Sequence, residues 1–347
     1  MTLETACKAV DFVTGLPLNG KQLDLGFFGG EPLLRFDLIQ AVVAYVEQKP
    51  LQVSGNIAYF ITTNGTLLTP EIIAFFQRKN FSLCVSLDGP ERIHDRERLY
   101  HNGRGSFQKV FENLQMAVGI VNRLQVNSVY SPETVEFMPE ILDFFINSGL
   151  KVVHFNPNIY SKWTKDAKPA IVNAFNQVAE QYIDCYRHGC ELAVNFLDSK
   201  MIVLFKDGFT PDDICGMGST EWGFAPSGNV YPCERFIGED TDMSLCMGNV
   251  HQGINPVKRC QILNQRGNHN PECQVCSLKK FCMNWCGCSN YFQTGHADMA
   301  GAMMCMIEQS AIEAAQKVFI TLTQEGNDLF LNHMLAYANS EINYRMI

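Results

Sequence analysis

Short apolar segments alternate with amphipathic ones along the first 160 residues. Five apolar segments have the length of buried strands, at 23–28, 56–64, 81–88, 124–130 and 151–157. Between them, apolar residues recur every three or four positions, which predicts helices. These helices cover 3–14 and 37–47, start after Thr69 and after Ser106, and end before Gly149. This alternation predicts a parallel sheet with helices outside it, curled into a full or partial barrel.

Three of the predicted strands are followed by short polar or glycine-rich turns. The turns are "GGEP" at 29–32, "NG" at 64–65 and "DG" at 88–89. Taken singly, each is consistent with an ordinary turn. Because the carboxyl ends of parallel strands meet at one end of a barrel, the three together indicate a ligand site. Paired glycines let a ligand approach the backbone, and a carboxylate can bind an ammonium group. A small zwitterionic or ribose-bearing ligand would suit this end of the barrel.

Composition narrows the class of protein. The chain has 347 residues, of which 46% are hydrophobic and 18% charged, enough for one large core or two domains. A net charge of −9 argues against a nucleic-acid binder with a broad basic face. The apolar runs are too short to span a membrane. The N-terminus "MTLETACKAVDF" lacks the basic and apolar regions of an export signal, so we expect a cytoplasmic protein with reduced thiols.

Cysteines concentrate in the last third of the chain. Ten of the fourteen lie between 215 and 305, and "CQVCSLKKFCMNWC" at 273–286 has the spacing C-x2-C-x5-C-x3-C. Zinc ribbons place two close pairs well apart, whereas only five residues separate Cys276 from Cys282. The compact spacing therefore favours iron–sulfur clusters, with zinc as the alternative. Cys246 and Cys260 do not fit the pattern, and we interpret them as structural.

Three stretches of the first half resemble the radical S-adenosylmethionine (SAM) superfamily. They are "FFGGEPLL" (27–34), "TTNGTLL" (62–68) and "VSLDGPERIHDRERLYHNGRGSFQKV" (85–110). The resemblance is to the branch of anaerobic sulfatase-maturating enzymes and peptide maturases. It implies that the GGEP segment binds the methionine amino group of SAM and that the serine of "SLDG" holds its carboxylate or ribose. The residues implied in SAM binding are Gly29, Gly30, Glu31, Pro32, Asn64, Ser86 and Arg98.

The cysteine pattern resembles the SPASM domain of the same enzymes, which carries two auxiliary [4Fe–4S] clusters. The resemblance assigns Cys215, Cys233 and Cys286 to the first cluster. It assigns Cys273, Cys276, Cys282 and Cys305 to the second.

Two positions depart from the pattern of the sulfatase-maturating enzymes. The eighth cysteine of those enzymes is replaced by Glu221, so the fourth iron of the first cluster could be open, bound by a carboxylate, or bound by a thiol such as Cys288. The aspartate that those enzymes carry after the second SPASM cysteine is here Glu234, which makes Glu234 a candidate catalytic base; the alternatives are a surface acid or a hydrogen-bond acceptor in the cluster loop.

Radical SAM enzymes also carry a C-x3-C-x2-C loop after their first strand. That spacing does not occur before Cys215. The expected fold is thus a partial (β/α)6 TIM-like barrel without its first strand, followed by a SPASM iron–sulfur domain. A misassigned start, a fragment or a lost radical step would each account for this. The expected divisions are a barrel at 1–160, a helical linker at 161–210, the SPASM domain at 211–310, and a helix and tail at 311–347.

The resemblance implies an anaerobic oxidoreductase. The intact enzyme would form a 5′-deoxyadenosyl radical from SAM and oxidatively modify a Cys or Ser side chain, as in sulfatase or peptide maturation. Its partners would be a sulfatase-like protein or a ribosomal peptide precursor, and a reductant such as flavodoxin or ferredoxin, with no nucleic acid and no membrane. The alternative is a non-catalytic iron–sulfur protein that transfers electrons or binds a peptide.

Overall fold

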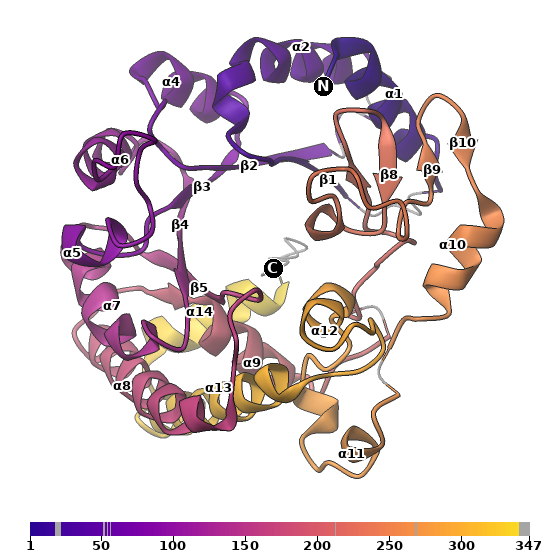
Figure 1. The fold of residues 1–347 in the computed structure, drawn as a ribbon. Helices are drawn as coiled ribbons and strands as arrows, with labels where there is room; N and C mark the ends of the chain where they lie inside the picture. The colour runs from indigo at the N-terminus through magenta and orange to yellow at the C-terminus, as the bar shows by residue number, and fades with distance from the viewer. Residues whose placement is uncertain are drawn as a thin grey trace.

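Six parallel strands form one sheet in the computed structural model, which describes residues 1–17, 22–50, 53, 55, 57–211, 213–267 and 269–339. The strands follow one another in chain order and curve into an arc with helices outside it (Figure 1). Their bounds are β1 Leu23–Phe27, β2 Ile57–Thr63, β3 Ser82–Ser86, β4 Arg123–Tyr130, β5 Val152–Pro157 and β6 Ala193–Val194. The α/β partial barrel and its five predicted strands are confirmed; Asn56, at the start of the second, lies outside the described residues. The sixth strand was not predicted.

Strand side chains alternate between the two faces of the sheet. Ile61, Leu83 and Val126 are fully buried against the outer helices. Their neighbours in sequence point to the inner face of the arc, where Asn127 and Asn156 lie, and Asn156 Nδ2 donates to Asn127 Oδ1 at 2.7 Å. Because side chains alternate with period two, the outer face carries the core and the inner face can be polar. The inside of the arc is therefore suited to a polar ligand.

Among the described residues up to 205, eight helices cover the outer face or connect the strands. They are α1 Leu3–Thr14, α2 Phe36–Glu47, α4 Pro70–Arg78, α5 Glu91–His94, α6 Phe107–Gln115, α7 Met138–Asn147, α8 Lys168–Arg187 and α9 Asn195–Phe205. Residues 161–210, which we expected to form a helical linker, supply α8 and α9 and also β6. Thr69 caps α4 as predicted, since its Oγ1 accepts a hydrogen bond from Ile72 N. Ser106 precedes α6 as predicted, but its side chain does not cap the helix. Instead, Asp95 Oδ1 accepts the hydrogen bond from Phe107 N.

The cysteine-rich part has its own small antiparallel sheet. Its strands are β7 Gly223–Phe224, β8 Asn229–Tyr231, β9 Gly248–Asn249 and β10 Gly253–Ile254, and its helices are α10 Pro256–Leu263, α11 Pro271–Gln274 and α12 Gly287–Thr294. This part lies across the open side of the arc (Figure 1). Phe12 of α1 contacts Trp222 at a ring-centroid distance of 5.1 Å, and Tyr160, just after β5, contacts Phe292 of α12 at 5.0 Å. The cysteine-rich part therefore touches both ends of the arc.

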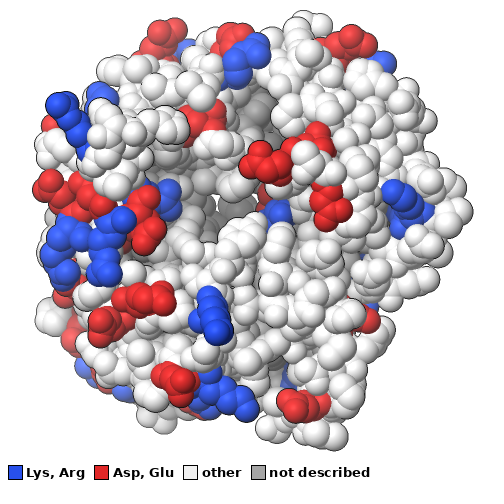
Figure 2. All heavy atoms as spheres, in the orientation of Figure 1, with Lys and Arg blue, Asp and Glu red and all other residues white. Residues whose placement is uncertain are grey.

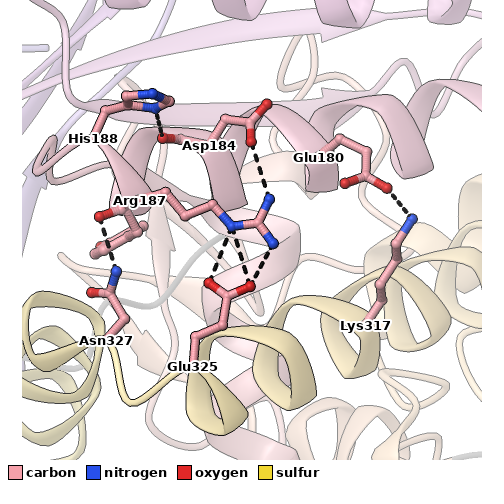
Figure 3. Close-up of polar contacts among 8 residues, drawn as sticks. Glu180, Asp184, Arg187, His188, Lys317, Glu325 and Asn327 are labelled. Carbon is pink, nitrogen blue, oxygen red and sulfur yellow. Dashed lines mark hydrogen bonds and ion pairs between the residues drawn. The ribbon is translucent and has the colours of Figure 1, made fainter.

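Two C-terminal helices return to the barrel. Helix α13 (Ala302–Gln324) packs against α8 and α9, and α14 (Asp328–Asn339) follows it. Figure 3 shows the polar contacts between α8 and α13: Arg187 pairs with Glu325 next to α13, and Lys317 of α13 pairs with Glu180. These ion pairs are largely exposed, so the buried apolar contacts contribute more to the packing. Across the described residues, no helix is both long and apolar enough to cross a bilayer.

Candidate functional site

The GGEP loop after β1 is held in place by one carboxylate. Glu31 Oε1 accepts hydrogen bonds from Leu33 N at 2.9 Å and from Thr63 Oγ1 at 2.7 Å. Glu31 Oε2 accepts one from Asn64 N at 2.8 Å. Because Thr63 and Asn64 follow one another at the end of β2, Glu31 ties the ends of two neighbouring strands together.

The two glycines of this loop leave room beside the backbone. Gly29 has a φ of +141°, which disfavours any residue with a side chain. No described atom lies within 4 Å of the position where a Cβ would stand on Gly29 or Gly30. The backbone is therefore accessible to a ligand here, and Pro32 directly after it starts the short helix Pro32–Arg35.

The turn after β2 uses the Asn64 side chain. Asn64 Oδ1 accepts hydrogen bonds from Thr66 N at 3.0 Å and from Thr66 Oγ1 at 2.7 Å. Gly65 has a φ of +76°, and a Cβ on it would stand 2.9 Å from Val85 Cγ1. The glycine thus lets this turn pack on β3. The carboxamide oxygen of Asn64, predicted to contact SAM, is engaged by its own turn.

Arg98, another predicted SAM contact, forms an ion pair with Asp88 of the "SLDG" turn. Arg98 Nε lies 2.5 Å from Asp88 Oδ2 and Arg98 Nη2 lies 3.1 Å from Asp88 Oδ1. Asp88 Oδ1 also accepts from Val129 N at 2.9 Å, which links the turn after β3 to β4. Ser86, at the end of β3, is half-buried. Arg98 therefore holds the turn that follows Ser86.

A buried histidine completes this network. His94 is fully buried; its Nδ1 accepts from Asp88 N at 3.2 Å, and its Nε2 lies 3.0 Å from Ser106 Oγ. Since Ser106 Oγ donates to Arg98 O, it accepts from His94 Nε2–H, and the imidazole is neutral. Burial lowers the pKa of His94 to about 4.

We expect acid to destabilise the protein through His94. Its pKa is lower in the folded chain than in the unfolded chain, so its contribution is complete above the unfolded pKa near 6.5 and is lost as pH falls toward about 4. The loss between pH 7 and pH 5 is about 2 kcal/mol. Urea denaturation at both pH values measures it, with His94→Gln as the comparison. If the variant loses as much stability as the parent over this range, His94 does not cause the loss.

Side chains on the inner face of the arc extend the polar surface beyond the strand ends. Asn195, at the start of α9, donates through Nδ2 to Phe155 O at 3.1 Å, and its Oδ1 accepts from Phe155 N at 2.9 Å. With Asn127 and Asn156 it forms a row of carboxamides across β4, β5 and α9. The sequence analysis missed this row, although each asparagine interrupts or follows an apolar strand. The face of the molecule shown in Figure 2 is hollowed near its centre, with charged side chains of both signs around the hollow.

The thiols predicted for the first auxiliary cluster lie close together. Cys215 interacts electrostatically with Cys286, and Cys233 with Cys288. The Sγ atoms of Cys286 and Cys288 are 3.7 Å apart. Burial raises the pKa of Cys215 to about 11, so a metal or cluster would have to displace thiol protons on binding. The structure thus places a fourth thiol beside the three predicted ones.

Three of the four thiols predicted for the second cluster interact with one another, whereas the fourth interacts with a carboxylate. Cys305, on α13, interacts electrostatically with Cys273 and Cys276. Cys282 instead forms a hydrogen bond with the buried carboxylate of Glu308. Within the described ranges, no three Cys, His, Asp or Glu side chains are arranged to hold a single metal ion. The donors are thiols in both groups, which is the ligand set that iron–sulfur clusters use.

Glu234, the candidate base, lies at the first group of thiols. Its Oε2 accepts a hydrogen bond from Cys233 Sγ at 3.2 Å, and the side chain is half-buried. Cys246 is buried and donates to Gly248 O at 3.2 Å, which fits a structural thiol, whereas Cys260 is exposed.

Gly223 lets the backbone of the Cys233 segment pack closely against it. Its replacement should therefore prevent the first group of thiols from binding a cluster. A Cβ on Gly223 would stand 2.8 Å from the carbonyl carbon and oxygen of Cys233, which are backbone atoms with little freedom to move. We expect Gly223→Ala to lower the iron bound after anaerobic reconstitution from about eight atoms per chain to about four. Iron and sulfide analysis measures this. Gly30→Ala, the same change at an open position, should keep the iron, and equal iron in both variants would contradict the prediction.

The fold and the glycine–carboxylate loop together define an α/β partial barrel of the radical SAM type. Residues 19–145 match the Radical SAM superfamily. The chain is 27% identical over 287 residues to the cysteine-type anaerobic sulfatase-maturating enzyme of Clostridium novyi, covering 75% of this chain and 72% of that protein. It is 26% identical over 250 residues to the radical SAM cyclopropyl synthase TigE of Paramaledivibacter caminithermalis, covering 69% of this chain but half of that protein.

Solved structures show the same fold. The structure of histidine-tagged anSMEcpe with bound AdoMet superposes with a TM-score of 0.80 at 17% identity, over 98% of this chain and 90% of that one. Streptococcus suis SuiB bound to its precursor peptide SuiA gives a TM-score of 0.57 at 14% identity, over 86% of this chain and 68% of that one. The chain therefore contains a radical SAM domain and is homologous to the anaerobic sulfatase-maturating enzymes and related peptide-modifying enzymes.

Proposed function

We propose that this chain supplies the SAM-binding barrel and the auxiliary-cluster domain of a radical SAM enzyme that modifies a peptide or protein side chain. The observation that carries the proposal is the GGEP loop. Its two glycines expose backbone with no described atom within 4 Å of their Cβ positions, directly before a carboxylate fixed by three hydrogen bonds. This is the geometry that a ligand carrying an ammonium group requires.

Five of the seven residues predicted to bind SAM have a role in this proposal; Asn64 is engaged by its own turn, and Pro32 starts the helix after the loop. The backbone at Gly29 and Gly30 and the carboxylate of Glu31 bind the amino group of SAM. Ser86 binds its carboxylate or ribose, and Arg98 acts by holding Asp88 and the turn that follows Ser86. When SAM is bound and reduced, it supplies a 5′-deoxyadenosyl radical that abstracts hydrogen.

The substrate proposed is a peptide segment with a Cys or Ser side chain. The relatives support it: one solved neighbour holds a Cp18Cys peptide, another a precursor peptide, and the curated relatives include cysteine-type and serine-type maturases. In this chain, the carboxamides of Asn127 and Asn156, which Asn195 contacts through Asn156, provide a polar surface for a peptide backbone inside the arc. Glu234 is the proposed base that accepts a substrate proton near the first cluster.

SAM binding by the reconstituted chain tests the proposal. We expect the full chain to bind SAM in equilibrium dialysis and to hold about eight irons. Gly30→Ala should leave the fold unchanged, because the position is open and its φ is not left-handed, yet weaken SAM binding about tenfold or more, since the added methyl group occupies the space beside the loop. Binding that is equal in the variant and the parent would exclude this loop as the site.

The alternative is a non-catalytic iron–sulfur protein that transfers electrons or binds a peptide. The thiol groups of the cysteine-rich part favour it, since they could hold clusters without any cleavage of SAM. SAM binding by the reconstituted chain distinguishes the two. A chain that holds about eight irons and binds SAM supports the enzyme, whereas a chain that holds about eight irons and binds no SAM supports the alternative.

A further inference from the structure

We propose that Cys288 is the fourth thiolate ligand of the first auxiliary cluster. This inference rests on the proposed function, because it presumes that Cys215, Cys233 and Cys286 bind a cluster. The Cys288 thiol lies 3.7 Å from Cys286 Sγ and interacts electrostatically with Cys233. Cys288 therefore directly contacts one of the three thiols already assigned to the cluster and lies near a second.

The backbone around Cys288 is shaped to bring it to this place. Cys286 and Cys288 flank Gly287, the first residue of α12, and a Cβ on Gly287 would stand 2.5 Å from Met217 Sδ. Met217 comes two residues after Cys215. The glycine thus lets the Cys-Gly-Cys segment approach the chain that carries Cys215, and all four thiols converge on one region.

The second candidate ligand is Glu221, which stands where the sulfatase-maturating enzymes have a cysteine. Its carboxylate acts electrostatically on Cys215 and Cys233. Iron–sulfur clusters are held predominantly by thiolates, and the Cys288 thiol is buried, with 4% of its surface exposed. A buried thiol in contact with one ligand thiol and near a second is a better donor than the Glu221 carboxylate.

The charge near Cys288 also fits a cluster with four thiolates. Four thiolates give a [4Fe–4S] cluster a net negative charge, which is costly away from water unless a cation lies nearby. Arg235 interacts electrostatically with Cys288, Cys286 and Cys233. Its guanidinium stabilises the negative charge on that side of the cluster.

A fully ligated first cluster has a consequence for mechanism. With every iron bound by a protein thiolate, no iron is open to a substrate thiolate. The substrate must then be positioned by side chains, such as the asparagines of the inner face, and the first cluster can accept an electron without binding the substrate.

Cyanide, which binds open iron sites, provides the test. We expect the EPR spectrum of the dithionite-reduced full chain to be unchanged by cyanide. In Cys288→Ser, we expect an altered spectrum that responds to cyanide, or a loss of about four of the eight irons. Glu221→Gln and Cys260→Ser, the latter at an exposed thiol, should behave as the parent.

Two results would overturn the assignment. One is a cyanide response in the parent protein, a measurement that does not depend on how any variant folds. The other is a Cys288→Ser protein with the iron content and spectrum of the parent, especially if Glu221→Gln differs. Failure of the proposed function is distinguishable, because a chain that binds no iron and sulfide at all would refute the clusters themselves.

Discussion

Replacement of Glu31 by Gln should abolish measurable SAM binding and destabilise the protein almost as much as replacement by Ala. The reason is that each carboxylate oxygen accepts one backbone N–H, from Leu33 on Oε1 and from Asn64 on Oε2. A carboxamide has only one acceptor oxygen, so in either orientation its NH2 group faces an N–H donor. We expect a loss of about 1–3 kcal/mol of unfolding free energy, which urea denaturation measures.

The control for this prediction is Glu71→Gln. Glu71 is exposed in the first turn of α4, so the same loss of charge should change stability by less than about 0.5 kcal/mol and leave SAM binding intact. If Glu31→Gln keeps the stability and the SAM affinity of the parent, the carboxylate neither fixes the loop nor binds the ligand.

The sequence was sufficient to predict the five long strands because each combines an apolar run with a turn residue after it. It did not reveal β6, since Ala193–Val194 is only two residues long and gains its place by pairing with β5. Periodicity cannot identify so short a strand, because the pairing depends on chain segments far away. The same holds for α6: Ser106 stands at the expected cap position, but tertiary contacts with His94 and Arg98 direct its hydroxyl elsewhere.

The candidate site, too, could be predicted from the sequence only in part. The local motifs correctly indicated which residues follow each strand, and the structure shows Glu31 tied to the next strand. The sequence could not show that Arg98 pairs with Asp88, or that Cys288 lies near Cys233, because only the fold brings these segments together. Cysteine spacing gives the number of donors but not their partners.

Breaking the buried ion pair between Lys200 and Glu308 should be the most destabilising single change. Lys200 Nζ lies 2.6 Å from Glu308 Oε2, and the two side chains are 3% and 7% exposed. Removing one partner by Lys200→Met leaves the other charge buried without its counter-charge, at a cost of about 3–5 kcal/mol. Urea denaturation should show this loss. Lys317→Met, which breaks the exposed pair with Glu180 shown in Figure 3, should cost less than about 1 kcal/mol.

The Lys200–Glu308 ion pair should also be needed for the second group of thiols to bind iron. Glu308 accepts hydrogen bonds from Met283 N and from Cys282, so it fixes the segment that carries Cys282. Lys200→Met should therefore lower the bound iron from about eight to about four atoms per chain. The double variant Lys200→Met, Glu308→Leu removes both charges and should recover part of the stability, because the groups that lose a partner, such as the Met283 N–H, are uncharged and cost about 1–3 kcal/mol each. It should not recover the iron, since Cys282 has lost the carboxylate that positions it. Recovery of both would show that the ion pair affects the thiols only through global stability.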